Sequence, residues 1–339
     1  MKKIISLALA VVMVLSMGMI MTGCGGGDAG DGGLKVTAVV STNLGDKSFN
    51  DSAKVGIDNL TAAGFDANIV ECNSNADLFE QNLRSAADAA DLIIGVGSEL
   101  DMIGTVANDY PDKKFVWVDN VMDDLASYPN LTCISYKQNE GSYLVGWVAG
   151  KMTESNVVGF IGGMDIPVIN DFYVGYAQGA KDANPDVKVV KNYTGDWSDT
   201  NLGAECGQAL AAQGADIIFC CGGGSGTGAI LKAEELKIKC IGVDQDMRIT
   251  MPDYADYIIC SMIKDVGASI EGLVKKVAED PEANWTGGEV FYAGMGDGYV
   301  GAAFGAEDQE VLVPEDIIAE LDGIKEKVVA GDLVVDTVL

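Results

Sequence analysis

The sequence predicts an α/β protein of two lobes, each built on a mainly parallel sheet with flanking helices. Apolar strand-like runs alternate with segments of helical periodicity along almost the whole chain, which is typical of stacked β-α units. The pattern starts again near Val157 after a long helical segment, so two similar lobes are expected. An apolar leader and a Gly-rich stretch leave about 305 residues, more than one hydrophobic core usually serves.

The expected strands share short apolar runs of five to seven residues. They are 35–41, 67–71, 92–96, 115–119, 157–161, 187–193, 217–221, 240–244 and 257–262. The segments between them repeat their apolar residues with helical spacing. They predict helices at 51–63, 76–89, 99–109, 138–152, 172–183, 201–213 and 226–236. A further helix is expected around 315–330, in a tail that packs back on a lobe.

The chain is expected to cross between the two lobes more than once. The first lobe is assigned to 34–136 and 265–303, and the second to 137–264 and 304–339. Polar or glycine residues follow the strands, for example at Ser41, Asp119, Gly222 and Asp244. In open parallel sheets, ligands bind at the carboxyl ends of the strands. Two such edges that face each other predict a ligand cleft between the lobes.

The first 24 residues are typical of a bacterial lipoprotein export signal. Two lysines precede an apolar run at 4–21, and a small residue stands before Cys24. We assign 1–23 to the signal peptide and expect lipid on Cys24 to anchor the protein to the extracytoplasmic face of the cell membrane. Residues 24–33 are Gly-rich and predict a flexible tether. The alternative is an uncut transmembrane anchor, for which the apolar run is barely long enough.

Charge and composition exclude several classes of function. The leader holds two of the 22 basic residues and none of the 51 acidic ones, so the exported part carries 20 basic against 51 acidic residues, a net charge of −31. Nucleic-acid binding needs a basic footprint, so no nucleic-acid partner is expected. The chain has no histidine, the commonest general base and metal ligand. We therefore expect no catalytic residue, no metal site and no cofactor.

Seven cysteines follow Cys24, and no two of them have the Cys-x-x-Cys spacing of a zinc site. Most lie in apolar strand-like runs such as 217–221 and 257–260, where a thiol behaves as a small core hydrophobe. We expect buried free thiols, with disulfides as the alternative.

The loop 45–50 follows the first strand directly and leads into a helix. The Phe49 ring, at this edge of the sheet, is able to stack on a flat ligand, and the Asn50 amide offers a donor and an acceptor. The structural alternative is that Asn50 or Asp51 only caps the helix while Phe49 packs beneath it. The loop chemistry does not decide between these two interpretations.

The glycine run 222–228 joins a strand to a helix, and Asp244 lies further along the chain. The run lacks both a strict Gly-x-Gly-x-x-Gly spacing and the Gly-Lys-Ser/Thr ending of nucleotide-binding loops. A glycine turn that lets a ligand approach backbone N–H groups is the more economical interpretation.

Six segments in order carry a family resemblance. They are 46–50 (Asp-Lys-Ser-Phe-Asn), 115–119, 162–168 with Phe172 and Gly175 behind it, 222–228, 241–246 and 261–264. They resemble the basic membrane protein family, the lipoprotein substrate-binding subunits of certain ABC importers. One departure concerns 42–44, which stands where family members typically have an acidic residue and a longer Gly-rich stretch. The contact that this acid usually makes with a base edge is not expected from this position.

The resemblance implies a type I periplasmic-binding-protein-like fold, in which two Rossmann-like lobes close on a purine nucleoside. It places Phe49 on one face of the base, and Asn50 and Asp119 at the edge of the base. It places Asp244 on two ribose hydroxyls, with Lys264 at the same polar end. A carboxylate accepts bidentately from a vicinal diol, and a neighbouring lysine offsets its charge.

Two residues are candidates for the second aromatic wall. Trp197 follows a strand and opens a helix, a place that also suits a ring packed at the helix entry. Phe172 is the other candidate, with the hydrophobic face of its own helix as the alternative place for its ring. Asn43 and Gly222 complete the expected ligand contacts.

The sequence thus predicts a lipid-anchored binding protein that delivers guanosine, adenosine or inosine to an ABC permease and its ATPase. A ligand-sensing domain for a membrane receptor is a second interpretation, and a flavin or another small molecule is an alternative ligand. An enzyme such as a nucleoside hydrolase or an NAD-dependent dehydrogenase is disfavoured, because histidine and a clean dinucleotide motif are both missing.

Overall fold

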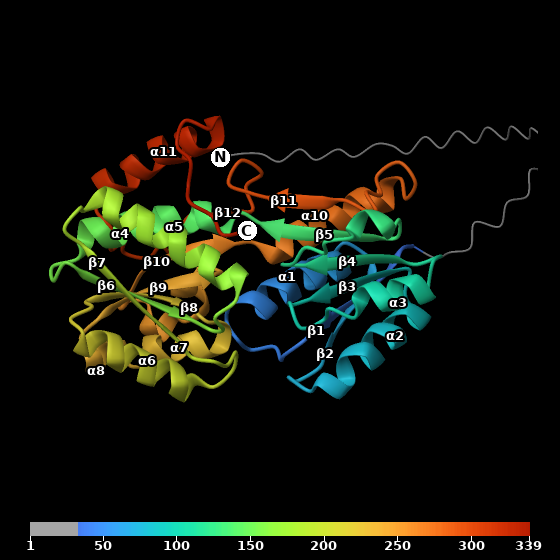
Figure 1. Ribbon diagram of the computed structural model, residues 1–339, viewed down its shortest axis with the longest axis horizontal. Coiled ribbons are helices and arrows are strands. Elements are labelled where there is room, and N and C mark those ends of the chain that lie inside the picture. Colours follow the sequence, from blue (N-terminus) through green and yellow to red (C-terminus); the bar gives the residue numbers. More distant parts are fainter. Residues whose placement is uncertain (1–32) are drawn as a thin grey trace, which may run out of the picture. The chain divides into compact units, whose positions relative to one another are not determined.

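The computed structural model describes residues 33–339, so the expected signal peptide, the lipidation site and nearly all of the tether lie outside the described residues. Two six-stranded sheets organise the described chain (Figure 1). The first contains β1 (Lys35–Val40), β2 (Asp66–Glu71), β3 (Leu92–Val96), β4 (Lys114–Val118), β5 (Leu131–Tyr136) and β11 (Val290–Ala293). The second contains β6 (Val157–Gly162), β7 (Lys188–Tyr193), β8 (Ile217–Cys221), β9 (Lys239–Asp244), β10 (Ile258–Lys264) and β12 (Val300–Ala303).

Both sheets share one topology. The first has the strand order β11-β5-β4-β3-β1-β2, and its pairings are parallel throughout. The second has the order β12-β10-β9-β8-β6-β7, with β12 antiparallel to β10 at its edge. In each sheet the order reverses between the first and third strands, β1 and β3 or β6 and β8. Such a reversal is where open α/β sheets form a binding crevice.

Helices cover the faces of both sheets. In the first half these are α1 (Phe49–Ala62), α2 (Phe79–Ala89), α3 (Ile103–Asp109) and α10 (Val266–Glu279), which packs on α1. The second half carries α4 (Gln138–Met152), α5 (Pro167–Ala183), α6 (Thr200–Ala212), α7 (Gly223–Leu231), α8 (Ala233–Leu236), α9 (Met247–Thr250) and α11 (Glu315–Ala330). No helix among residues 33–339 combines the length and the apolar character that crossing a membrane requires.

The nine expected strands are confirmed, with ends that move by one or two residues. Three expectations for helices were wrong in detail. Helix 99–109 begins only at Ile103, helix 226–236 is two helices that begin at Gly223, and helix 172–183 begins at Pro167. Proline suits a first helical turn because its missing N–H has no intrahelical partner there.

The second sheet includes β12, which the lobe assignment had placed in the first lobe. Its residues pair with β10 from Ser261 to Lys264, so the strand returns to the second sheet directly after β11. The lobe boundary is therefore better drawn before Val300 than after residue 303.

The tail packs back on the second half, as expected. The Trp147 Nε1–H and the Lys151 ammonium, both on α4, bond the Glu320 carboxylate of α11. The Asp171 carboxylate on α5 accepts hydrogen bonds from the Thr337 hydroxyl and the Val338 N–H. In Figure 1, α11 accordingly lies over α4.

Glycines bring α4 and α5 unusually close together. A Cβ at Gly175 would overlap the Asn139 backbone oxygen, and a Cβ at Gly179 would overlap the Tyr143 oxygen. Backbone therefore meets backbone along this pair, which fixes α5 against α4. This contact sets the position of Phe172, one turn before Gly175.

Candidate ligand-binding cleft

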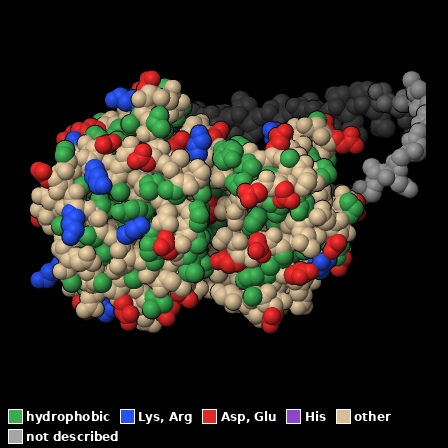
Figure 2. Space-filling view, in the orientation of Figure 1, with side chains coloured by type: hydrophobic (Ala, Val, Ile, Leu, Met, Phe, Trp, Pro, Cys, Tyr) green, Lys and Arg blue, Asp and Glu red, His purple; other side chains and the backbone are tan. Residues whose placement is uncertain are grey.

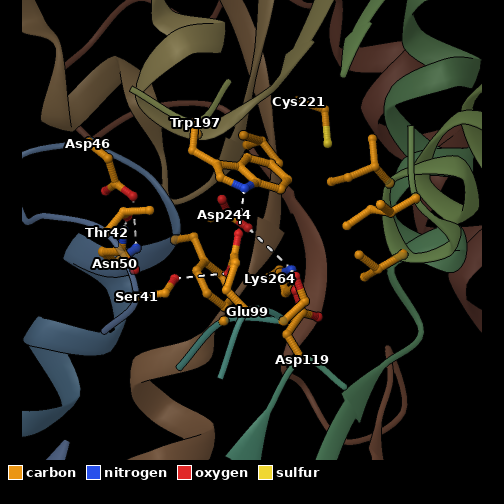
Figure 3. A pocket seen from close by; sticks show the side chains of 18 of the residues that line it. Ser41, Thr42, Asp46, Asn50, Glu99, Asp119, Trp197, Cys221, Asp244 and Lys264 are labelled. Carbon is orange, nitrogen blue, oxygen red and sulfur yellow. Dashed lines mark hydrogen bonds and ion pairs between the residues drawn. The ribbon is translucent and has the colours of Figure 1, made fainter. Parts of the chain in front are cut away.

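A cavity of about 70 Å³ lies where strand ends from the two sheets meet (Figure 3). Its walls come from the loops after β1, β3, β4, β6 and β7, from the carboxyl ends of β8, β9 and β10, and from the first turns of α1, α5 and α7. The lining residues are Ser41, Thr42, Asp46, Phe49, Asn50, Gly97, Ser98, Glu99, Asp119, Ile166, Val168, Ile169, Phe172, Trp197, Cys221, Gly223, Val243, Asp244 and Lys264. The cavity thus sits at the order reversal of both sheets.

Seven of the nine ligand contacts expected from sequence line this cavity: Phe49, Asn50, Asp119, Phe172, Trp197, Asp244 and Lys264. The other two lie just outside it. Asn43 is exposed at the rim, where its Oδ1 accepts from the Ser198 hydroxyl at 3.4 Å. Gly222 is buried, and its neighbour Gly223 lines the cavity in its place.

An ionic cluster forms the floor of the cavity. The Lys264 Nζ, at the end of β10, lies 2.8 Å from the Asp119 Oδ2 and 3.9 Å from the Asp244 Oδ1. The Ser48 hydroxyl donates to the Asp244 Oδ2. The Oδ1 atoms of Asp119 and Asp244 are buried without a hydrogen-bond partner among the described residues. Two acceptors in the cavity wall are therefore unsatisfied.

Burial and charge set the protonation of this cluster. Desolvation raises the pKa of Asp244 to about 6, against the opposing effects of the Lys264 ammonium and the Ser48 hydrogen bond. Desolvation alone would lower the pKa of Lys264, but Asp119 and Asp244 outweigh it and raise that pKa above its ordinary value. The lysine is therefore charged, and one cation faces two carboxylates.

Asp119 belongs to the same polar cluster as Asp244. The resemblance had separated these residues, with Asp119 at the base edge and Asp244 at the ribose. In the structure both carboxylates face one lysine, and Asn50 lies apart from them beside Thr42 (Figure 3).

The Asp46 carboxylate makes the largest number of backbone hydrogen bonds at the start of α1. The Asp46 carboxylate accepts from the backbone N–H groups of Ser48, Asn50 and Asp51, at 2.9, 2.9 and 3.1 Å. Burial raises the Asp46 pKa, and these three hydrogen bonds oppose the rise. Of the two caps expected as the alternative, Asn50 does not cap the helix, because its side-chain amide donates to the Thr42 Oγ1 at 2.6 Å. The Asp51 carboxylate does bond the loop before the helix, since it accepts from the Gly45 and Lys47 N–H groups at 2.7 and 3.0 Å.

Phe49 and Phe172 flank the lysine. The Lys264 Nζ lies 4.7 Å from the centre of the Phe49 ring and 4.9 Å from that of Phe172, within range of cation–π attraction. Phe172 is 1% exposed and also packs on Phe219. The Phe172 ring therefore belongs to the core and also lines the cavity.

Trp197 crosses the cavity from the second half toward the first. Its indole N–H donates to the Glu99 Oε1 at 2.6 Å, and the Glu99 Oε2 accepts from the Ser41 hydroxyl at 3.0 Å (Figure 3). The indole lies on Gly163, where a Cβ would overlap the ring. The Trp197 ring is able to occupy this position only because Gly163 has no side chain.

Glu99 is the main residue that the sequence analysis missed. It follows β3 as Ser41 follows β1, and these two strands are neighbours in the sheet. The rule that polar residues at strand ends form the site would have selected it. The apolar wall of Ile166, Val168 and Ile169 comes from the start of α5 and carried no comparable signal.

The glycine run has a packing role besides its place at the cavity. A Cβ at Gly228 would overlap the Thr200 oxygen, so α7 and α6 touch through backbone. The expected close approach of backbone to a ligand is possible only at Gly223, the one residue of the run that lines the cavity.

The thiols are free among the described residues, and Cys206 is the only one of the seven not fully buried. Cys221, at the end of β8, lines the cavity. Burial raises its pKa well above the ordinary value.

Two α/β lobes that enclose a cavity at facing strand ends are an architecture that two-lobed solute-binding proteins have. Residues 34–336 match the family described as ABC transporter substrate-binding protein, PnrA-like. The chain belongs to this Bmp family, whose members are substrate-binding proteins and not enzymes. The family recognised in the sequence is therefore confirmed.

Similar proteins agree with this assignment. The chain is 34% identical to the ABC transporter nucleoside-binding protein BmpA of Lactococcus lactis subsp. cremoris, over 81% of this chain and 83% of the relative. It is 32% identical to the CD4+ T-cell-stimulating antigen of Listeria innocua, over 96% and 97%. An ABC transporter solute-binding protein from Aeropyrum pernix has the same fold, with a TM-score of 0.76, 23% identity, and coverage of 89% of this chain and 94% of that one.

Proposed function

We propose that this protein captures a purine nucleoside in the cleft and presents it to an ABC permease and its ATPase. The observation that carries the proposal is the pair of unsatisfied acceptors, the Oδ1 atoms of Asp119 and Asp244, in the cavity wall. A buried acceptor without a partner costs free energy, and the vicinal hydroxyls of a ribose would satisfy both. The similarity to a protein named as nucleoside-binding supports the same ligand class.

The base is proposed to lie against Phe49, with Trp197 as the second wall. Phe172 is buried and contacts Lys264, whereas Trp197 is half-buried and reaches across the cavity. Aromatic rings on both sides of a purine supply stacking that tolerates different bases. Lipid on Cys24 is proposed to hold the protein at the extracytoplasmic face of the membrane, next to the permease.

Mass spectrometry of ligand released from freshly purified protein tests the proposal directly, followed by calorimetry with guanosine, inosine, adenosine and riboflavin. A nucleoside is expected in the released fraction. Riboflavin as the sole ligand, or no binding of any nucleoside, would overturn the proposal.

Asp244→Ala is expected to lower nucleoside affinity at least about 30-fold, because hydrogen bonds to a charged group contribute about 1.5–3 kcal/mol each. Asp101→Ala is the matched control, since Asp101 is exposed near the same cleft and does not line it. Circular dichroism would show that both variants fold. Unchanged calorimetric affinity in Asp244→Ala would remove the residue from the site.

A further inference from the structure

The Glu99 carboxylate lines the cavity apart from the ionic cluster and has spare capacity for a donor on the ligand. Its Oε1 accepts from the Trp197 indole and its Oε2 from the Ser41 hydroxyl, both neutral donors. Each carboxylate oxygen is able to accept two hydrogen bonds. One acceptor position on each oxygen is thus left for a further donor.

The other three acids that line the cavity have a charged or a backbone partner, although one oxygen of Asp119 and one of Asp244 lack a hydrogen bond. Asp119 and Asp244 face the Lys264 ammonium at 2.8 and 3.9 Å. The Asp46 carboxylate accepts three backbone N–H groups at the start of α1. Among these four carboxylates, Glu99 alone has neither a cation nor a backbone N–H as its partner.

The position of Glu99 separates it from the ionic cluster. It enters from the loop after β3, and its hydrogen bonds lead to the end of β1 and to Trp197 of the opposite lobe (Figure 3). The region 42–44 of this chain offers no acid of its own. Glu99 therefore supplies a negative charge at the β1 and β3 edge of the cavity.

We infer that Glu99 is a specificity-determining residue that selects a base with two adjacent N–H donors on one edge, which is the guanine pattern. This inference rests on the proposed nucleoside function and adds the choice of base to it. The guanine N1–H and its 2-amino group match the two oxygens of a carboxylate bidentately. Hypoxanthine offers the N1–H alone, and adenine presents an unprotonated N1 that repels a carboxylate.

Calorimetry with guanosine, inosine and adenosine tests this inference in the wild-type protein and in Glu99→Gln. The wild-type protein is expected to bind guanosine at least about fivefold more tightly than inosine, and adenosine least tightly, as a bidentate contact to a base implies. In Glu99→Gln the preference for guanosine over inosine is expected to fall below about twofold, because the amide keeps one acceptor and adds a donor. Asp101→Asn, which removes a charge outside the cavity, should keep the wild-type preference.

The ratio of the guanosine and inosine affinities shows whether Glu99 selects the base or has only a structural role. If Glu99 only fixes Trp197, Glu99→Gln weakens all three nucleosides by the same factor, and the unchanged ratio overturns the inference while the proposed function stands. If Glu99→Gln fails to fold, the wild-type ranking decides, because adenosine or inosine binding as tightly as guanosine also overturns it. If the wild-type protein binds no nucleoside, the proposed function fails and the inference falls with it.

Discussion

Asp119 and Asp244 share a backbone conformation that few residues adopt. Each has a φ of +66° and stands at the end of a central strand, β4 in one sheet and β9 in the other. Aspartate tolerates this left-handed region better than most residues with a side chain. The chain turns sharply after each strand, and both carboxylates meet Lys264. Backbone strain of this kind is concentrated at functional sites, which fits the two acids better than a role in the core.

Lys264 completes this arrangement with a single positive charge. It is 2% exposed and has three aromatic rings near its ammonium, those of Phe49, Phe172 and Tyr136. Removing a charge from water is costly, so the two carboxylates are what keeps the lysine protonated at this depth. The excess negative charge is left for donors on the ligand.

The raised pKa of Asp244 predicts that nucleoside affinity depends on pH. Its pKa of about 6 in the folded protein exceeds the ordinary 3.8, so its contribution to folding stability is full below pH 3.8 and is lost as the pH rises through 6. Nucleoside affinity depends on pH in the opposite direction, because the ribose hydroxyls donate to the ionised carboxylate. Affinity should therefore fall below pH 6, by at most about tenfold per unit.

Calorimetry from pH 7.5 to pH 5 would measure this change. The charged groups that act on Asp244 are Lys264, Asp119 and Asp46. Asp244→Asn has no proton to gain at this position and should bind weakly with a flatter profile. A wild-type affinity that stays constant down to pH 5 would show that the ligand does not need the ionised form.

At the scale of elements, the loops at the carboxyl ends of strands decide the shape of the cavity. Gly163 follows β6, and the Trp197 ring from the loop after β7 lies directly on it. This contact explains why a tryptophan at a helix entry reaches into the cleft and does not pack beneath α6. The loops after the neighbouring strands β6 and β7 thus form one wall of the cavity.

Gly163→Ala is expected to weaken nucleoside binding at least about tenfold. The added Cβ overlaps the indole, so the ring must leave its place and lose its hydrogen bond to Glu99. The loss of about one charge-assisted hydrogen bond and one stacking surface accounts for this magnitude. Isothermal titration measures it, and intrinsic fluorescence reports the movement of the indole.

Gly301→Ala is the matched control in the same sheet, because a Cβ at Gly301 meets no atom within 4 Å. It should bind as the wild-type protein does. Equal affinity in Gly163→Ala and Gly301→Ala would mean that the indole is not a wall of the site.

The sequence allowed most strands to be predicted, because a strand buried on both faces is a continuous apolar run. Leu92–Val96 and Ile217–Cys221 are fully buried and were predicted to the residue. Three strands were not predicted: β11 and β12 are partly exposed four-residue strands at sheet edges, and β5 is fully buried but has Thr132 and Ser135 within its run. Helix α10 was missed although Val266, Ile270, Val274 and Val277 recur at helical spacing, so there the signal was present and unused.

Asp244 was predictable from its place at the end of a strand, whereas Lys264 entered only through the family resemblance; both line the cavity. The candidate site was less predictable where a contact joins the two lobes. The hydrogen bond between Glu99 and Trp197 could not be predicted from local sequence, because 98 positions separate the two residues. Asp46 caps α1 from outside the usual capping position, which the spacing of the loop did not indicate.

At the scale of the whole described chain, polar contacts across the cleft join the two sheets. They include the Trp197 to Glu99 hydrogen bond, the Lys264 to Asp119 pair and the hydrogen bond from the Gln245 amide to the Ser48 carbonyl. Acidic side chains are spread over both halves of the face drawn in Figure 2, which fits the net charge of the chain. Such charge opposes compaction, so contacts that bridge the cleft matter for keeping it closed.

The closed cleft predicts that a nucleoside stabilises both lobes together. The cavity of about 70 Å³ is smaller than the ~300–1,000 Å³ of ordinary ligand pockets, so the lobes must part to admit the ligand. Once bound, the ligand would contact Phe49 and Asp119 on one side and Trp197 and Asp244 on the other. Guanosine at 100 times its dissociation constant should then add about 2.7 kcal/mol to the free energy of unfolding.

Differential scanning calorimetry with and without guanosine measures this gain as a rise of a few degrees in Tm. The whole transition should move, because a ligand held by both lobes is released only when the cleft opens. Asp244→Ala, with its affinity lowered at least about 30-fold, should gain at most about 0.9 kcal/mol at the same guanosine concentration and show a correspondingly smaller rise. Two separate transitions, of which guanosine moves only one, would mean that a single lobe holds the nucleoside and that closure contributes nothing to its capture.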